Sequence, residues 1–385
     1  MNTRSEPRRS TGRSKTLSDS PQTKVRSINR QGLTAAFLLA AFVSAGVLFT
    51  VGTSAQQSAP PPAPADLPTP PPLPEEDEGI IEIDTELVNV LFTAQDRQRK
   101  LITDLRDTDI KLYENGEPQE IIEFVRRIDL PLSLTILIDT SASQERTLPE
   151  EKEAAKSFLE SVVRPSKDEV AIVSFTGEAT LEQGMTNNVS RLRRAVDNVR
   201  FSPPSGYVGG GVVVGTPPIS GRNQMTLGST AIWDAVWVTS EEVLGPAPDG
   251  TRRAMILLTD GVNTYGVKKM REAIESALKA EVVIYSIGIG DNYYDGVDKG
   301  ALKKISQSTG GNAFFPRDER ELREAFDQIQ EEMRSQYLIA YEPTNQALDG
   351  TYRKIDVQLI NQQLVREKVQ LTHREGYFAK TGRRK

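Results

Sequence analysis

The chain has 385 residues, of which 37% are hydrophobic and 26% are charged, and its formal net charge is -6. This length exceeds one ordinary domain. The absence of cysteine excludes disulfides and thiol catalysis, so stability must come from a core and from any bound ion. Residues 1–31 carry eight Lys or Arg against two acids, which leaves the remainder distinctly acidic and argues against nucleic-acid binding.

The first 79 residues concern location rather than fold. A basic region, 1–32, precedes an apolar run from Leu33 to Val51 and the small residues Thr53-Ser-Ala55. Residues 33–55 are therefore predicted to be either a cleaved signal peptide or an uncleaved membrane anchor that spans at 33–51. Residues 56–79 form a Pro-rich linker, which is semi-rigid. The folded part is predicted to be exported: periplasmic, extracellular or anchored to the membrane.

Alternating apolar stretches, which are typical of strands, lie on both sides of the central region. Before it, in 80–129, they are Ile80-Ile-Glu-Ile-Asp84, Val88-Asn-Val-Leu-Phe92, Ile110-Lys-Leu-Tyr113 and Ile121-Ile-Glu-Phe124. After it, in 335–378, they include Tyr337-Leu-Ile-Ala-Tyr341 and Tyr352 to Leu359. Asn115-Gly116 predicts a hairpin turn. Neither flank has enough strands for its own core, so the two flanks are expected to form one small all-β sandwich, followed by a basic tail at 379–385.

The central region, 130–334, predicts an α/β fold with a doubly wound, mostly parallel sheet. Apolar runs of strand length alternate there with helical patterns, and these runs lie at 132–138, 169–175, 254–259 and 282–288. A helix is predicted directly after Thr230, with Gly245-Pro246 at its end. Another is predicted at about 318–334. Trp233 and Trp237 on the first helix are expected to pack against neighbouring elements.

Three loops of this region carry oxygen-bearing side chains. Asp139-Thr-Ser-Ala-Ser143 follows the first strand, Thr230 opens a helix, and Asp260 follows another strand. Open α/β sheets bind ligands at the carboxyl ends of their strands, and hard cations such as Mg²⁺ prefer oxygen ligands. Taken alone, the first loop is equally compatible with a helix cap.

The order and separation of Asp139, Ser141, Ser143, Thr230 and Asp260 resemble the metal-ion-dependent adhesion site of von Willebrand factor A domains. The resemblance covers about 130 to 333. It implies that Ser141, Ser143 and Thr230 bind Mg²⁺, or Mn²⁺ or Ca²⁺, through their hydroxyls, and that the two Asp residues act directly or through water. It also implies a protein partner that supplies an acidic residue to the ion.

The whole layout resembles bacterial exported proteins described as VWFA-related, best known from acidobacteria. Gln336-Tyr-Leu338 and Arg374-Glu-Gly-Tyr377 carry this second resemblance. The two resemblances together imply a non-enzymatic, metal-dependent module for adhesion or scaffolding. An alternative is a subunit that assists a motor ATPase or the assembly of an envelope complex, although the export segment argues against a cytosolic ATPase partner.

A metal-dependent hydrolase is a further alternative, but the sequence lacks its usual parts. Ser141 occupies the place of the second Asp in the Asp-x-Asp motif of aspartyl-phosphate phosphatases, and no Gly-x-Ser-x-Gly or His-Glu-x-x-His motif is present. The Gly-rich segment 202–228 lacks the ending of a phosphate-binding loop. A mobile loop is expected there, and whether it lines the binding face stays open.

Overall fold

The computed structural model describes residues 87–126, 129–202, 229–290 and 296–382, with the backbone of two short paired strands, β8 (Val208–Gly209) and β9 (Val212–Val213). These residues all belong to one compact unit, Gly79–Lys385. The predicted basic region, signal or anchor, Pro-rich linker and first apolar stretch lie outside the described residues, as does most of 202–228. Within the described part, no helix is both long and apolar enough to cross a membrane.

The predicted α/β fold class is confirmed by a six-stranded sheet with the order β12-β11-β10-β5-β6-β7. Its strands are parallel except β7, which pairs antiparallel with β6 at one edge. The strands are β5 (Leu132–Asp139), β6 (Glu169–Phe175), β7 (Ala179–Thr186), β10 (Arg252–Thr259), β11 (Val282–Gly288) and β12 (Ala313–Phe314). All eight residues of β5 are buried, as expected for a central strand that is covered on both faces.

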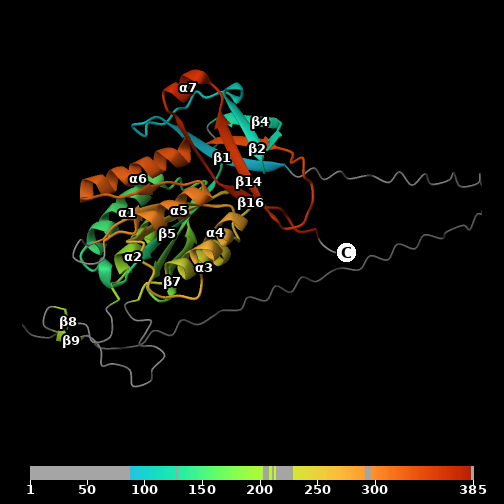
Figure 1. Ribbon diagram of the computed structural model, residues 1–385. Helices are drawn as coiled ribbons and strands as arrows, with labels where there is room; N and C mark the ends of the chain where they lie inside the picture. Colours follow the sequence, from blue (N-terminus) through green and yellow to red (C-terminus); the bar gives the residue numbers. More distant parts are fainter. Residues whose placement is uncertain are drawn as a thin grey trace, which may run out of the picture. The chain divides into compact units, whose positions relative to one another are not determined.

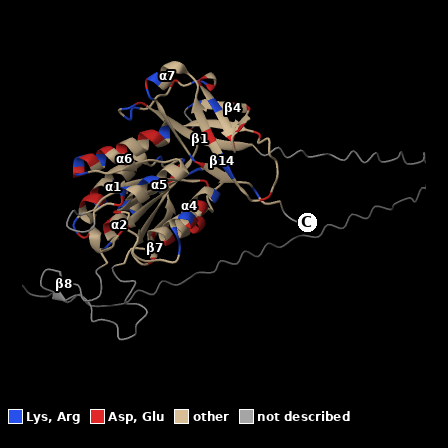
Figure 2. Ribbon diagram, in the orientation of Figure 1, with Lys and Arg blue, Asp and Glu red and all other residues tan. Residues whose placement is uncertain are grey.

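Helices cover both faces of this sheet (Figure 1). One core joins the sheet to α1 (Leu148–Val162), α2 (Val189–Asn198) and α6 (Glu319–Arg334). The other joins it to α3 (Ile232–Val238), α4 (Met270–Lys279) and α5 (Lys299–Thr309). Along α6, acidic and basic residues alternate on the surface, and the pairs Arg320–Glu324 and Arg323–Glu319 are spaced four apart (Figure 2). That face of α6 is therefore a solvated one.

The helix after Thr230 is shorter in its α-helical part than the sequence predicts. It continues from α3 into a π-helical turn, η3 (Thr239–Leu244), and the Gly245 N–H donates to the Ser240 carbonyl over 2.9 Å. A side chain at Gly245 would place its Cβ 2.6 Å from the Glu241 carbonyl, so only glycine fits this end. Trp233 is buried, and Trp237 lies under the Lys268 ammonium at 3.9 Å from the ring centre. Both tryptophans thus have packing roles.

The strands of the two flanks pair with one another in two four-stranded sheets, β15-β1-β13-β4 and β16-β14-β2-β3. Each sheet mixes strands from before and after the central region, and one core lies between the two sheets, where the Phe92 ring stacks on Tyr337 at 5.0 Å. The strands are β1 (Val88–Gln95), β2 (Ile110–Glu114), β3 (Glu117–Gln119), β4 (Ile121–Arg126), β13 (Tyr337–Tyr341), β14 (Tyr352–Leu359), β15 (Gln370–His373) and β16 (Gly376–Phe378). Short helical turns also occur at η1 (Asp107–Asp109) and α7 (Gln362–Arg366).

The predicted hairpin joins β2 to β3. Asn115 and Gly116 adopt φ values of 50° and 89°, and Glu114 pairs with Glu117 across the turn. Both central residues therefore have the positive φ that a type I′ turn requires, which is why Asn-Gly is favoured there. The Asn115 side chain also accepts a hydrogen bond from the Lys354 N–H on the neighbouring β14, over 2.9 Å.

A buried polar network joins the two flanks inside the sandwich. The Glu114 carboxylate accepts hydrogen bonds from the hydroxyls of Tyr341, at 2.7 Å, and Tyr377, at 2.9 Å. The guanidinium of Arg353, which is 2% exposed, lies 3.6 Å from the same carboxylate and donates to backbone carbonyls of the loop before β14. One residue from β2 is thus held by residues from β13, β14 and β16.

Candidate metal centre

The carboxyl ends of β5, β6 and β10 bring the three oxygen-bearing loops to one edge of the sheet. Ile138 of β5 pairs in register with Leu258 of β10, so Asp139 and Thr259 end their strands at the same level and Asp260 follows immediately. On the other side of β5, Asp139 pairs with Phe175 of β6. This is the edge at which doubly wound sheets bind ligands.

Asp139 is fully buried at the centre of this edge. Its Oδ1 accepts a hydrogen bond from the Ser141 N–H over 2.9 Å, and its Oδ2 accepts one from the Thr259 hydroxyl over 2.6 Å. Burial raises the pKa of Asp139 to about 7; the hydrogen bonds from Thr259 and Ser141 oppose this rise, and the neighbouring Asp260 charge adds to it. A nearby cation would stabilise the ionised form of this carboxyl group, which burial otherwise disfavours.

The hydroxyls of Ser141 and Ser143 lie together at the start of the next turn, η2 (Ala142–Gln144). Their Oγ atoms are 3.2 Å apart, with Ser141 buried and Ser143 half-buried. The Gln144 side chain fixes the turn, because its Nε2 donates to the Ser143 Oγ and to the Ile289 carbonyl, each over 3.2 Å. The turn is therefore held against the loop after β11.

Thr230 is held between the ends of β6 and β10 by its own backbone. The Ala231 N–H donates to the Thr176 carbonyl over 2.7 Å, just beyond β6. The Thr230 N–H donates to the Thr264 hydroxyl over 2.8 Å, and the Thr230 carbonyl accepts from the backbone N–H of Thr264, over 3.0 Å, in the loop after β10. Thr230 itself is 5% exposed.

Asp260 is positioned by the loop that follows it. Its Oδ1 accepts from the Val262 N–H over 2.9 Å, and its carbonyl accepts from the Asp298 N–H over 2.8 Å. The next residue, Gly261, has a φ of 82°, and a Cβ there would lie 2.9 Å from the Leu302 side chain. Glycine is thus required for the chain to turn away while the Asp260 side chain, in a residue only 5% exposed, stays at the edge.

The donor set fits a hard divalent cation. It offers three hydroxyls and two carboxylates, which suit Mg²⁺ and leave coordination positions for water or a partner oxygen. Among the described residues, no group of three or more His, Cys, Asp or Glu side chains is arranged to hold a metal. Hydroxyl oxygens would therefore have to complete any cation site at this edge.

Sequence reasoning missed three residues around this site: Thr259, Gln144 and Glu151. Thr259 contacts Asp139 because β10 pairs with β5 in a register that puts the two residues at the same level. This register is visible only once the strands are paired, so the sequence alone did not identify Thr259. Gln144 donates to the Ser143 hydroxyl. Glu151 lies three residues after Leu148 on the buried face of α1, and this spacing is a signal that the sequence does contain.

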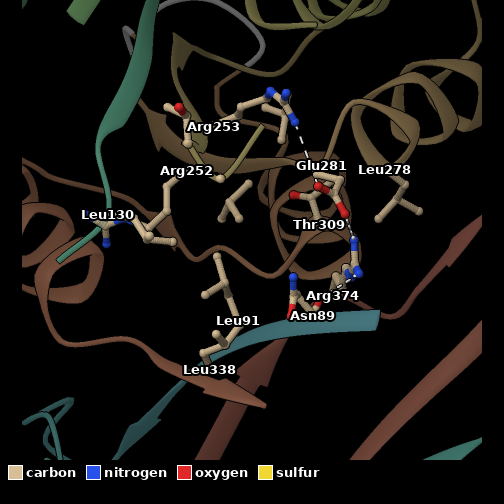
Figure 3. A pocket seen from close by; sticks show the side chains of 14 residues that line it. Asn89, Leu91, Leu130, Arg252, Arg253, Leu278, Glu281, Thr309, Leu338 and Arg374 are labelled. Atoms are coloured by element: carbon tan, nitrogen blue, oxygen red, sulfur yellow. Dashed lines mark hydrogen bonds and ion pairs between the residues drawn. The ribbon is translucent and has the colours of Figure 1, made fainter. Parts of the chain in front are cut away.

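A separate cavity of about 140 Å³ lies at the opposite end of the sheet, where β10 and β11 begin. Figure 3 shows the Glu281 carboxylate between two guanidiniums, 3.8 Å from that of Arg253 and 3.4 Å from that of Arg374. Leu91, Leu278 and Leu338 contribute apolar lining. Among the lining residues, the one acidic side chain, that of Glu281, is thus paired with two basic ones.

Glu281 itself has a φ of 54°, a conformation that favours glycine. Replacing Glu281 by glycine is expected to give a more stable protein than replacing it by alanine, by about 1 kcal/mol. Both variants lose the same ion pairs, but only alanine keeps the unfavourable backbone conformation. Urea denaturation of the two variants measures the difference, and equal stabilities would contradict it.

Comparison with known proteins points to one family. Two models of the von Willebrand factor type A domain match adjacent segments, 134–216 and 219–328. No curated protein sequence matches the chain significantly. Among solved structures, proximal thread matrix protein 1 from the mussel byssus has 22% identity and a TM-score of 0.43, covering 57% of this chain and 51% of that chain.

Two further solved structures are similar at the same level. Another structure of the mussel protein, described as having a zinc-occupied MIDAS motif, has 16% identity and a TM-score of 0.40 over 54% of this chain and 49% of that chain. An aerotolerance-related membrane protein from Bacteroides fragilis has 16% identity and a TM-score of 0.39 over 52% of this chain and 100% of that chain. The chain spans about half the length of the mussel protein.

Proposed function

Because the central part of this chain is a von Willebrand factor type A domain, we propose that the protein is a non-enzymatic, divalent-metal-dependent binding module. Domains of this family are generally interaction modules. The partner in this proposal is a protein that presents an acidic side chain to the edge formed by Asp139, Thr230 and Asp260. Adhesion and scaffolding are the two roles that such binding would serve.

In this proposal, Ser141, Ser143 and Thr230 provide hydroxyl ligands, while Asp139 and Asp260 act directly or through water. When bound, Mg²⁺, Mn²⁺ or Ca²⁺ would supply Lewis acidity toward a carboxylate oxygen of the partner. Thr259 and the Ser141 N–H orient the Asp139 carboxylate, and Gln144 orients the Ser143 hydroxyl. Three of the five groups are neutral, so much of the ion's charge would remain available to the partner.

The observation that carries the proposal is the fully buried Asp139 carboxylate at the meeting point of three loops. Both of its oxygens accept hydrogen bonds from neutral groups. Among the described residues, no Lys, Arg or His forms an ion pair with it. A divalent cation would supply the missing charge and stabilise the ionised carboxylate.

Mg²⁺ or Mn²⁺ is expected to raise the melting temperature of the purified chain, and Asp139→Asn is expected to remove this increase. The substitution keeps the side-chain volume but removes the charge that would bind the ion. Asp168→Asn is the matched control, because Asp168 is equally buried but pairs with Arg164 at the other end of β6. Equal melting temperatures of the wild type with the ion and with chelator would refute the proposal.

We also propose that the folded part acts outside the cytoplasm. The support is the basic region, 1–32, followed by the apolar run at 33–51. Digestion of intact cells or spheroplasts by added protease tests this location. Protection of the chain until the cytoplasmic membrane is opened would favour the alternative of a cytosolic subunit that assists a motor ATPase.

A further inference from the structure

A glutamate interrupts the apolar face of α1. The residues of this helix that face the sheet include Leu148, Ala155, Phe158 and Leu159, which pack into the core shared with β5. Glu151 occupies the same face and is 0% exposed. A carboxylate in such a place loses its hydration, so it is retained only at a considerable cost unless something replaces the water.

Among the described residues, no group makes a hydrogen bond of normal geometry to this carboxylate; the Thr147 hydroxyl, which is near enough to lower its pKa, donates to Gln144 instead. Neither Oε atom of Glu151 is satisfied among the described residues. The other two buried glutamates of the described part are well paired: Glu114 accepts from Tyr341 and Tyr377, and Glu332 accepts from Gln95, at 2.6 Å, and Asn312, at 2.9 Å. Of the three buried glutamates in the described part, Glu151 is thus the one whose carboxylate oxygens lack hydrogen bonds of normal geometry.

That position adjoins the candidate metal centre. The Glu151 N–H donates to the Thr147 carbonyl over 3.1 Å, and the Thr147 hydroxyl donates to the Gln144 Oε1 over 3.0 Å. Gln144 in turn donates to the Ser143 hydroxyl. A continuous polar path thus runs from the start of α1 to a predicted ligand.

The charges of the site also reach Glu151. Burial raises its pKa to about 8; Thr147 opposes this rise, and the carboxylates of Asp139 and Asp260 add to it. The three acidic groups are therefore close enough to repel one another. A cation placed among Asp139, Asp260 and Ser143 would attract all three carboxylates, and it would therefore stabilise the ionised form of Glu151 as well.

We propose that Glu151 serves the metal centre without binding the ion itself, by accepting a hydrogen bond from a water molecule bound to the ion. This inference rests on the proposed function. Glu151 is a positioning residue in it: it orients that water and adds negative charge on the α1 side, while the loop residues bind the ion directly. An additional carboxylate strengthens cation binding, and groups that hold a ligand in place commonly change metal affinity by 10–100-fold.

The test is a titration of the full chain, purified in detergent, with Mg²⁺ and with Mn²⁺. Both tryptophans lie in α3, directly after Thr230, so their fluorescence reports on the site, and calorimetry gives an independent Kd. Glu151→Gln is expected to weaken Mg²⁺ binding by at least tenfold while leaving the melting temperature in chelator unchanged or higher. Glu332→Gln, which removes a buried but well-paired glutamate, is the matched control and is expected to keep the wild-type Kd.

Two outcomes would overturn the inference, and they are distinguishable. If the wild type binds Mg²⁺ and Glu151→Gln binds it with the same Kd within twofold, Glu151 is not part of the centre and the proposed function stands. If the wild type binds neither ion, the proposed function fails and the inference fails with it. Glu151→Met, which suits the apolar face in size and polarity, replaces Glu151→Gln if that variant does not fold.

Discussion

Glu114→Ala is expected to lower the free energy of unfolding by about 3–5 kcal/mol, which is a large part of the stability of an ordinary domain. The substitution removes the buried carboxylate partner of the Arg353 guanidinium, which keeps only the exposed Asp349 carboxylate at 3.9 Å, and it removes the acceptor of two tyrosine hydroxyls. Because these partners come from β13, β14 and β16, the loss would affect the packing of both flanks. Urea denaturation followed by far-UV circular dichroism measures the change.

Glu117→Ala is the matched control for this prediction. Glu117 lies three residues further along the same hairpin and is exposed, so its removal is expected to change stability by less than about 0.5 kcal/mol. Tyr377→Phe is expected to have an intermediate effect of about 1 kcal/mol, since it removes one hydrogen bond to Glu114. Similar stabilities of Glu114→Ala and Glu117→Ala would show that the network does not hold the flanks together.

In the presence of chelator, the protein is expected to lose stability as the pH rises from about 5 to 8. Folding raises the pKa of Asp139 from 3.8 to about 7 and that of Glu151 from 4.5 to about 8. The folded state therefore keeps protons that the unfolded state releases, and increasing pH favours unfolding across this window. A shift of this size in one group corresponds to a loss on the order of 4 kcal/mol.

The measurement is a series of urea denaturation curves at fixed pH values, with chelator and with Mg²⁺. Saturating Mg²⁺ is expected to remove most of the decline, because the ion favours the ionised carboxylates. The double variant Asp139→Asn, Glu151→Gln is expected to flatten the profile in chelator. A wild-type profile in chelator that stays level or rises between pH 5 and 8 would contradict the prediction.

Much of the fold is predictable because its strands are buried in two distinct ways. The central strands are buried on both faces and appear as continuous apolar runs, so β6 and β11 match their predicted ranges. The flanking strands are buried on one face and alternate, as β2 and β14 do. β7 shows neither pattern, since it is a partly exposed edge strand, and the short α7 buries no residue. Both were missed for that reason.

The candidate site also contains residues that the sequence identifies and residues that only the structure identifies. Asp139, Ser141, Ser143, Thr230 and Asp260 form a spaced motif that the sequence displays directly, and their role as metal ligands remains a prediction. Thr259 matters because β10 pairs with β5 in one register, and sequence alone does not specify a register. Glu151 matters because both oxygens of its buried carboxylate lack a hydrogen bond of normal geometry among the described residues, which is a property of the packed structure.

The way the chain enters and leaves the central sheet has a mechanical consequence. β4 leads into β5, and α6 leads into β13; Arg126 at the end of β4 pairs with Tyr337 at the start of β13. The two covalent links therefore attach to adjacent positions on neighbouring antiparallel strands. A tensile load applied at the carboxyl edge of the six-stranded sheet would be shared by β4 and β13. It would pull both strands in the same direction. Their mutual hydrogen bonds would carry little of the force, which would pass as shear to the strands on either side.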